Sequence, residues 1–213
     1  MKDYNRREIA LAAGLSGVAG FVDAVGFLKL GGFFVSFMSG NSTRLGVGLG
    51  EMALQQVALA AILIGLFFTG VIAGALVARF GWTGRGPVLA FVATLLIVAA
   101  SAFALSIDVL GVTCLVLAMG VENAVFQRDG EVAVGLTYMT GALVKAGQRV
   151  AAALTGGDRW AWAPYLLLWA SLTLGAALGA VSYARFGALA TWAPAALTAF
   201  LAVRVGLREW SRR

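Results

Sequence analysis

Long apolar runs, separated by short polar connections, cover most of the chain. Six of them stand out, and several reach the roughly 20 residues that a helix needs to cross a bilayer. They span about residues 9–28, 54–77, 88–105, 109–125, 162–183 and 190–207. The first follows a basic amino terminus but has no clean cleavage site, so we interpret it as a retained helix rather than a signal peptide. The pattern predicts an all-α membrane protein of about six transmembrane helices.

Two further apolar segments are interrupted by polar residues. Residues 31–50 read GGFFVSFMSGNSTRLGVGLG. The interruption consists of Ser39, Gly40, Asn41, Ser42 and Thr43, and Arg44 follows at once. Residues 134–150 read VGLTYMTGALVKAGQRV, where Thr140 and Gly141 take the places of Ser39 and Gly40 and Lys145 that of Arg44. We predict two broken segments, either re-entrant or discontinuous, and such pairs mark binding sites in many carriers.

The two broken segments belong to a longer internal repeat. The stretch 20–25 resembles 120–125, and Gly70-x-x-x-Gly74 resembles Gly175-x-x-x-Gly179. The order helix, broken segment, helix, helix thus occurs twice, in residues 1–107 and 108–213 of a single integral membrane domain. Three spans per half make the repeats inverted, whereas four make them parallel. We expect the small-x-x-x-small pairs to pack the two halves together.

Composition and charge agree with this class and orient the chain. Only 12% of the 213 residues are charged, roughly half the fraction of a soluble domain, and mean hydropathy is +0.89. The net charge of +6 comes from basic residues at the termini and in short loops, which indicates membrane topology rather than a nucleic-acid partner. Six spans leave only Lys29 and Arg185 outside and put both termini in the cytoplasm. Eight spans are not excluded, but they weaken this bias.

The broken segments carry the candidate binding chemistry. Backbone interrupted at membrane depth must be buried in protein or line a wet cavity. Asn41, Ser42 or Thr43 can cap a helix that begins there, and the amino end of a helix favours an anion or a carboxylate. Arg44 adds a fork of donors at the same place, while in the second copy Thr140 and Gly141 would cap the helix and Lys145 would supply the charge. The alternative is a tight turn near the interface, with Arg44 snorkelling to headgroups.

Two acidic residues lie inside predicted spans. Asp23 and Glu122 are costly there, so each is expected to mark a transport pathway or to have a charged partner. We predict ion pairs of Asp23 with Arg44 and of Glu122 with Lys145. Alternatively, one of the two carboxyl groups carries a proton. Asn123 occupies the position that matches Asp23, so the acid of the second half is shifted by about 100° around its helix, which argues against a symmetric proton site.

Other chemistry finds no support in the residue pattern. The chain has no histidine, and its one cysteine, Cys114, cannot form an intrachain disulfide. A nucleophile elbow, a Walker loop and a histidine-containing metal motif do not occur. We therefore expect no enzymatic activity, no cofactor and no metal.

The motifs also carry a family resemblance. The run GFVDAVGFLKLGGFFVSFMSGNSTRLGVGL, with the later GLTYMTGALVKAGQR, resembles the YoaK-like family of bacterial multi-pass membrane proteins, known chiefly as a domain of unknown function. The resemblance covers nearly the whole chain. It implies a bacterial inner-membrane protein of about six spans, and it brings no substrate, catalytic residue or cofactor.

Two functions are compatible with these features. The first is a small-solute carrier or channel, whose anionic or carboxylate-bearing solute binds near Ser39–Arg44 and Thr140–Lys145. The second is a membrane scaffold or accessory subunit that transports nothing. The partners expected are the bilayer and, for the first function, the solute. The sequence leaves open whether the chain forms a homo-oligomer.

Overall fold

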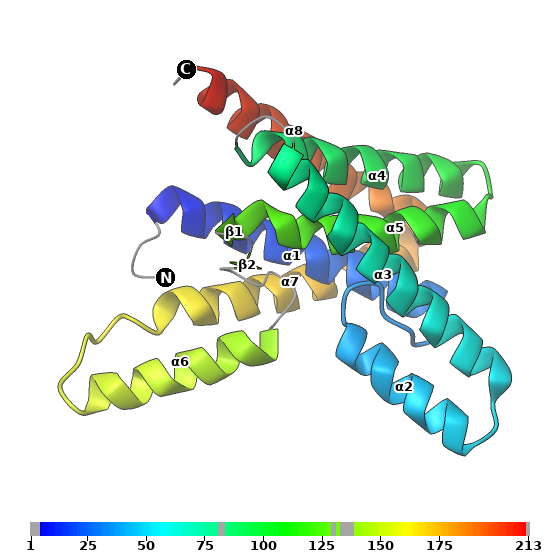
Figure 1. Ribbon diagram of the computed structural model, residues 1–213, viewed down its shortest axis with the longest axis horizontal. Helices are drawn as coiled ribbons and strands as arrows, with labels where there is room; N and C mark the ends of the chain where they lie inside the picture. Colours follow the sequence, from blue (N-terminus) through cyan, green and yellow to red (C-terminus); the bar gives the residue numbers. More distant parts are fainter. Residues whose placement is uncertain (1–4, 81–83, 129–130, 133–138, 212–213) are drawn as a thin grey trace.

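Helices dominate the architecture (Figure 1). The computed structural model describes residues 5–80, 84–128, 131–132 and 139–211. Within these residues the α-helices are α1 (Arg6–Lys29), α2 (Met38–Gly50), α3 (Leu54–Phe80), α4 (Gly86–Ala104), α5 (Asp108–Glu122), α6 (Met139–Leu154), α7 (Ala163–Phe186) and α8 (Trp192–Trp210). Two 3₁₀ turns, η1 (Asn123–Phe126) and η2 (Gly187–Thr191), extend α5 and lead into α8. A two-residue hairpin of β1 (Gln127–Arg128) and β2 (Glu131–Val132) follows η1.

Five described stretches are long and apolar enough to cross a membrane. They are Arg6–Lys29, Leu54–Phe80, Gly86–Ala104, Asp108–Phe126 and Ala163–Trp210. The last has 48 residues and contains both α7 and α8, each more than 18 residues long. With 13 residues, α2 is only about 20 Å long and is not among the candidate spans. The predicted all-α, multi-spanning class is confirmed.

Glycines bring two pairs of helices into close contact. On the face between α1 and α7, a Cβ at Gly20 would overlap the Leu172 carbonyl oxygen, and one at Gly175 would overlap that of Gly17. On the face between α3 and α5, a Cβ at Gly70 would overlap the Leu117 carbonyl oxygen. Small residues let helix backbones approach closely in membranes, where there is little hydrophobic force between helices. The predicted small-residue contacts are confirmed as contacts within the chain.

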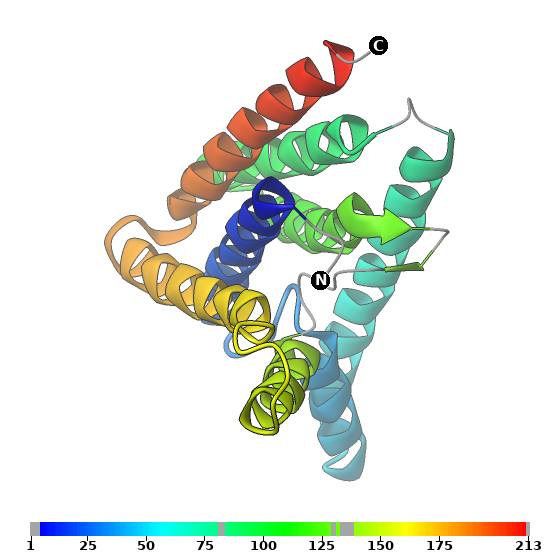
Figure 2. The same ribbon diagram turned by 90° about the vertical axis from the view of Figure 1, so that its left-hand side faces the viewer.

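The remaining helices complete a bundle with an apolar interior and an apolar exterior. Helix α4 packs between α5 and α8, whereas α2 packs on α3 and α6 on α7 at the periphery. Figures 1 and 2 show α2 and α6 projecting from the bundle. The fully buried side chains include Leu15, Leu63, Leu96, Leu115 and Met119. Large apolar side chains such as Phe68, Leu174 and Leu178 are exposed, as expected of lipid-facing positions.

The two ends of the bundle differ in charge. At one end, the beginning of α1, the end of α3, the beginning of α4 and the end of α8 carry arginines. These residues define the arginine-rich end: Arg6, Arg7, Arg79, Arg85, Arg204 and Arg208. At the opposite end, Lys29 Nζ lies 2.9 Å from Asp108 Oδ1 and joins α1 to α5. Both described termini lie at the arginine-rich end, because Arg85 contacts Glu8 and Glu209.

Candidate functional site

The segment between α1 and α2 folds back along α1. Gly31 and Gly32 have φ values of +62° and +98°, which glycine adopts without strain, and they reverse the chain after Lys29. The backbone N–H groups of Val35 and Ser36 then donate to Asp23 Oδ1, each at 2.8 Å. Since Asp23 lies about 9 Å before the end of α1, the segment returns at least that far into the bundle. A carboxylate of the preceding helix therefore anchors this return.

The side chain of Asn41 fixes the same segment from the other side. It is fully buried, and its Oδ1 accepts from the Phe34 backbone N–H at 3.0 Å. Its Nδ2 donates to the Phe34 carbonyl oxygen at 2.7 Å. The amide thus pairs with one residue of the segment as a neighbouring strand would. Asn41 is a positioning residue for segment 30–37. Contrary to the prediction, it does not cap α2.

The polar run Ser39–Thr43 does not break a helix, so that part of the prediction is wrong. Helix α2 is continuous from Met38 to Gly50, and the chain reversal lies upstream, in segment 30–37. The hydroxyl groups of Ser42 and Thr43 donate to the carbonyl oxygens of Met38 and Ser39, at 2.9 and 3.1 Å. These bonds within the helix satisfy the hydroxyls locally. The amino end of α2 has no side-chain cap, and Ser39 is exposed there.

Arg44 returns its charge toward the beginning of α2. Its guanidinium carbon lies 4.8 Å from the centre of the Phe33 ring, and its Nη2 approaches Gly32 so closely that a Cβ there would lie 2.7 Å away. The predicted pair with Asp23 is wrong, because Asp23 binds backbone N–H groups instead. Within the described ranges, Arg44 forms no ion pair. The guanidinium thus lies over segment 30–37, and no described carboxylate neutralises its charge.

The second segment is only partly described. The stretch 133–138 lies outside the described residues, so the predicted break before Met139 is not placed. Thr140, Gly141 and Lys145 lie in α6 and are exposed, while Ala142 and Ala146 on the same helix are buried. Helix α6 packs against α7. Lys145 is therefore presented outward, and Ala142 makes a helix contact where Asn41 makes hydrogen bonds.

Glu122 is buried, and no described residue pairs with it. It is fully buried near the end of α5, and neither Oε1 nor Oε2 has a hydrogen-bond partner among the described residues. The predicted ion pair with Lys145 is wrong, since Lys145 is exposed on α6. The neighbouring Asn123 is also buried, but its Nδ2 donates to the Met119 carbonyl oxygen at 2.9 Å. Glu122 is thus an acidic group that no described side chain or backbone group compensates.

The arrangement brings the amino ends of α2 and α6 together. In Figure 1 both helices begin near the middle of the molecule and run toward opposite ends, and Figure 2 shows the two beginnings at similar height. Helix α1 also runs opposite to α5, and α3 runs opposite to α7. Ser39 and Thr140 lie in the first turns of α2 and α6. Both residues therefore belong to the helix ends that begin in this region.

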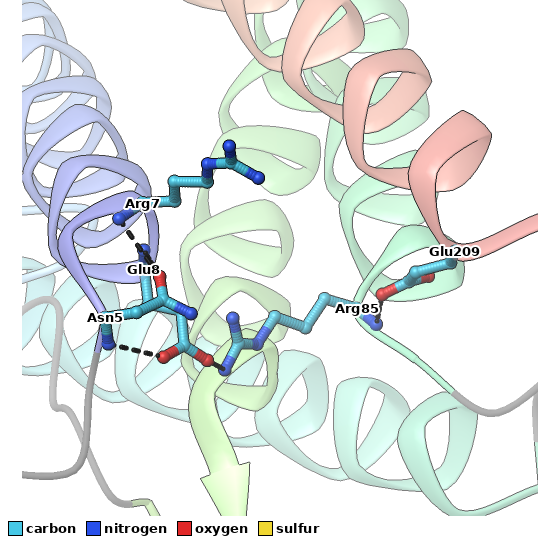
Figure 3. A network of polar contacts seen from close by, with 5 residues as sticks. All are labelled: Asn5, Arg7, Glu8, Arg85 and Glu209. Atoms are coloured by element: carbon cyan, nitrogen blue, oxygen red, sulfur yellow. Dashed lines mark hydrogen bonds and ion pairs between the residues drawn. The ribbon is translucent and has the colours of Figure 1, made fainter. Parts of the chain in front are cut away.

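A polar network at the arginine-rich end was not predicted (Figure 3). Arg85 Nη2 lies 2.7 Å from Glu8 Oε1, and the guanidinium carbon lies 4.6 Å from the centre of the Phe126 ring. The Glu209 carboxylate accepts from the backbone N–H groups of Arg85 and Gly86, at 2.8 and 3.0 Å. The network joins α1, α4, η1 and α8, whose residues are far apart in sequence. In the sequence, only their charge distinguishes these residues, and charge alone does not predict which residues they contact.

Two cavities open at this end of the bundle. The first, of about 680 Å³, is lined by Arg79, Arg85 and Gln127 among others. The second, of about 570 Å³, lies between α1 and α8. Neither is lined by residues 39–44. The described residues contain no group of three or more His, Cys, Asp or Glu side chains placed to hold a metal ion.

Fold and spans together define a multi-pass helical membrane protein. Residues 11–204 match the family described as "Protein of unknown function (DUF1275)", and the chain belongs to that family. A UPF0700 transmembrane protein of Rhizobium meliloti is 35% identical over 209 residues, which cover 96% of this chain and 90% of the relative. No solved structure matches the chain. The comparisons confirm the resemblance to a family of transmembrane proteins, and they do not carry the YoaK name.

Proposed function

We propose that the chain is a small-solute carrier or channel built from two inverted repeats, and that an anionic or carboxylate-bearing solute binds where α2 and α6 begin. The observation that carries this proposal is the opposed course of the two short helices, whose amino ends both lie near the middle of the molecule. Paired half-helices with converging amino ends form the solute sites of inverted-repeat carriers.

Two observations support inverted repeats. Helices α1 and α5 play matching parts: each contributes a glycine, Gly20 or Gly120, to a close contact with α7 or α3 respectively. Matching helices also run in opposite directions (Figure 1). The repeats then comprise α1–α4 and α5–α8, with α2 and α6 each returning to the side from which its segment entered. This gives six passes, rather than the eight that a full crossing of α2 and α6 would give.

The charges favour an anion. The amino end of α2 lacks a side-chain cap, and the Arg44 guanidinium lies back over the segment that leads into it. Unsatisfied N–H groups and the helix dipole attract negative charge. Asp23 already occupies the N–H groups of Val35 and Ser36, so the solute is left with the donors of Ser39, Thr140 and Arg44. Lys145 is exposed and contributes through its field rather than by contact.

The orientation follows from the arginines. With the arginine-rich end in the cytoplasm, both termini are cytoplasmic, as the positive-inside rule favours for a bacterial inner-membrane protein. Glu122 is the group best placed to take up a coupling proton, because it is an intramembrane acid whose oxygens have no partner in the part of the chain that the structure describes. Asp23 has a structural role instead.

Uptake by purified protein in liposomes tests the proposal. Counterflow of a panel of labelled inorganic anions and small carboxylates is measured for the wild type, for Arg44→Gln and for Arg185→Gln, an exposed arginine on α7 that serves as the control. We expect accumulation of at least one anion, loss of at least tenfold in rate for Arg44→Gln, and no loss for the control. Absence of uptake for the whole panel, or an unchanged rate in Arg44→Gln, would falsify the proposal.

One observation favours a non-transporting scaffold as the second candidate. Neither of the two cavities reaches residues 39–44, and the lipid-facing surfaces of α3, α7 and α8 are large and apolar. A scaffold would recognise its partner through such surfaces within the membrane. Specific co-purification of one membrane protein, lost on substitution of α7 surface residues such as Leu178 and retained in Arg44→Gln, distinguishes this function from transport.

A further inference from the structure

The cavity between α1 and α8 combines arginines with an apolar wall. Its charged lining consists of Arg7, Glu8, Arg85, Arg204, Arg208 and Glu209. Leu11, Phe200, Leu201 and Val205 supply apolar surface to the same cavity of about 570 Å³. We name it the α1–α8 cavity. It plays no part in the proposed solute site, which lies at the beginnings of α2 and α6.

The charges of the α1–α8 cavity are not balanced. Among the described lining residues, four arginines face two glutamates, which leaves a surplus of two positive charges. Both acids are already used: Glu8 binds Arg85, and Glu209 binds the backbone N–H groups at the beginning of α4. Arg7, Arg204 and Arg208 are exposed and form no ion pair with another described residue. In Figure 3 Arg7 extends away from the Glu8–Arg85 pair.

The polar and apolar parts of the cavity lining are separated along the axis of α8. Phe200 and Leu201 lie about two turns before Arg208 on α8, so they are about 10–12 Å closer to the middle of the helix. The guanidinium carbon of Arg204 lies 5.5 Å from the Phe200 ring centre, at the boundary between the two parts. Phe200 is 56% exposed, and Trp210 follows the arginines at the end of α8. The cavity thus has a cationic rim toward the end of α8 and an apolar wall closer to the middle of the helix.

We propose that the α1–α8 cavity binds an anionic phospholipid, with its phosphate between Arg7, Arg204 and Arg208 and an acyl chain along Phe200 and Leu201. Basic pockets between transmembrane helices at the cytoplasmic side recognise anionic headgroups. A free phosphate ion would use the arginines but not the apolar wall. A zwitterionic lipid would use the wall but would gain little from the surplus charge.

Native mass spectrometry of the purified chain in detergent tests the proposal. Phosphatidylglycerol, phosphatidylcholine and inorganic phosphate are titrated separately against the wild type and the triple variant Arg7→Gln/Arg204→Gln/Arg208→Gln. The control is Arg149→Gln/Arg159→Gln/Arg185→Gln, which removes three exposed arginines that do not line the cavity. Thermal unfolding with and without each lipid is measured in parallel.

We expect wild type and control to retain phosphatidylglycerol at least tenfold more tightly than phosphatidylcholine, and only phosphatidylglycerol to raise the midpoint of unfolding. Because each basic side chain near a membrane surface contributes about a factor of five, the triple variant should lose on the order of a hundredfold in affinity. Equal affinity of the wild type for both lipids overturns the proposal. This comparison uses the wild type alone, so it does not depend on whether a variant folds. Equal loss in the control, or competition by millimolar inorganic phosphate with no lipid preference, overturns it as well.

Discussion

The bonds from Val35 and Ser36 to Asp23 make the clearest energetic prediction. Both donors belong to buried residues, with exposed fractions of 0% and 4%. Asp23→Ala removes their acceptor, and an unsatisfied buried N–H costs about 1–3 kcal/mol. Because Asp23 is only half-buried, water can accept part of the hydrogen bonding that Asp23→Ala removes. We therefore expect the two lost bonds together to cost about 2–3 kcal/mol in stability of the segment. Asp23→Asn should cost only about 1 kcal/mol, since both bonds end on Oδ1, which the amide retains without its charge.

Hydrogen–deuterium exchange measures this cost where it occurs. A loss of 2–3 kcal/mol should speed exchange in peptides covering residues 31–44 by about 30- to 160-fold in Asp23→Ala. Asp23→Asn should speed it by only about fivefold. Asp108→Ala, which removes the exposed ion pair with Lys29, is the control and should leave these peptides unchanged. Equal exchange in Asp23→Ala and the wild type, or equal effects of Ala and Asn, would refute the anchoring role of Asp23.

Further predictions concern helix packing, the buried acid and the polar network, each measured by thermal unfolding in detergent. Gly175→Ala should destabilise by about 1–3 kcal/mol because the new Cβ meets the Gly17 carbonyl, while Gly46→Ala, which faces open space, should not; equal midpoints would contradict the packing. Glu122→Leu should raise the midpoint of unfolding and Asn123→Leu should lower it, because of these two side chains only that of Asn123 has a hydrogen-bond partner among the described residues. A lower midpoint for Glu122→Leu would show that the carboxyl group is satisfied. Glu209→Gln loses one of two backbone acceptors and should cost about 1–2 kcal/mol, against no change for the exposed Glu51→Gln.

The sequence predicted the long helices well, for a physical reason. Lipid demands about 20 consecutive apolar residues, and that demand leaves a local pattern. The run 54–77 became α3 (Leu54–Phe80), and 190–207 became α8 (Trp192–Trp210). The glycine pairs were equally readable, because only a small residue fits where two helix backbones approach.

The first segment is interrupted upstream of the polar run that predicts the break, because polar side chains by themselves do not make a backbone irregular. Ser42 and Thr43 satisfy their hydroxyls within α2, so they do not disturb it. The chain reverses instead at Gly31 and Gly32, within a mostly apolar and aromatic stretch. In the sequence, the two adjacent glycines, which adopt positive φ without strain, indicate such a turn better than the polar residues that follow.

The partners of the charged residues could not be predicted. Asp23 binds backbone N–H groups, which every residue possesses, so no sequence pattern marks them. Arg85 meets residues 77 and 124 positions away, and only the folded bundle brings them together. Burial of an unpaired carboxyl is costly, which predicts a partner for Glu122. Its lack of one within the described ranges is what makes it a candidate for proton uptake.

Thiol accessibility at the beginnings of α2 and α6 tests the central claim without knowledge of the solute. Ser39→Cys and Thr140→Cys are introduced separately into Cys114→Ala protein in proteoliposomes and treated with a membrane-impermeant maleimide. Val47→Cys and Val144→Cys, at apolar positions that are 50% and 55% exposed on the same two helices, serve as lipid-facing controls. A shared aqueous solute site predicts rapid labelling at residues 39 and 140, while residues 47 and 144 remain inert. Labelling at 39 and 140 as slow as at 47 and 144 would contradict it.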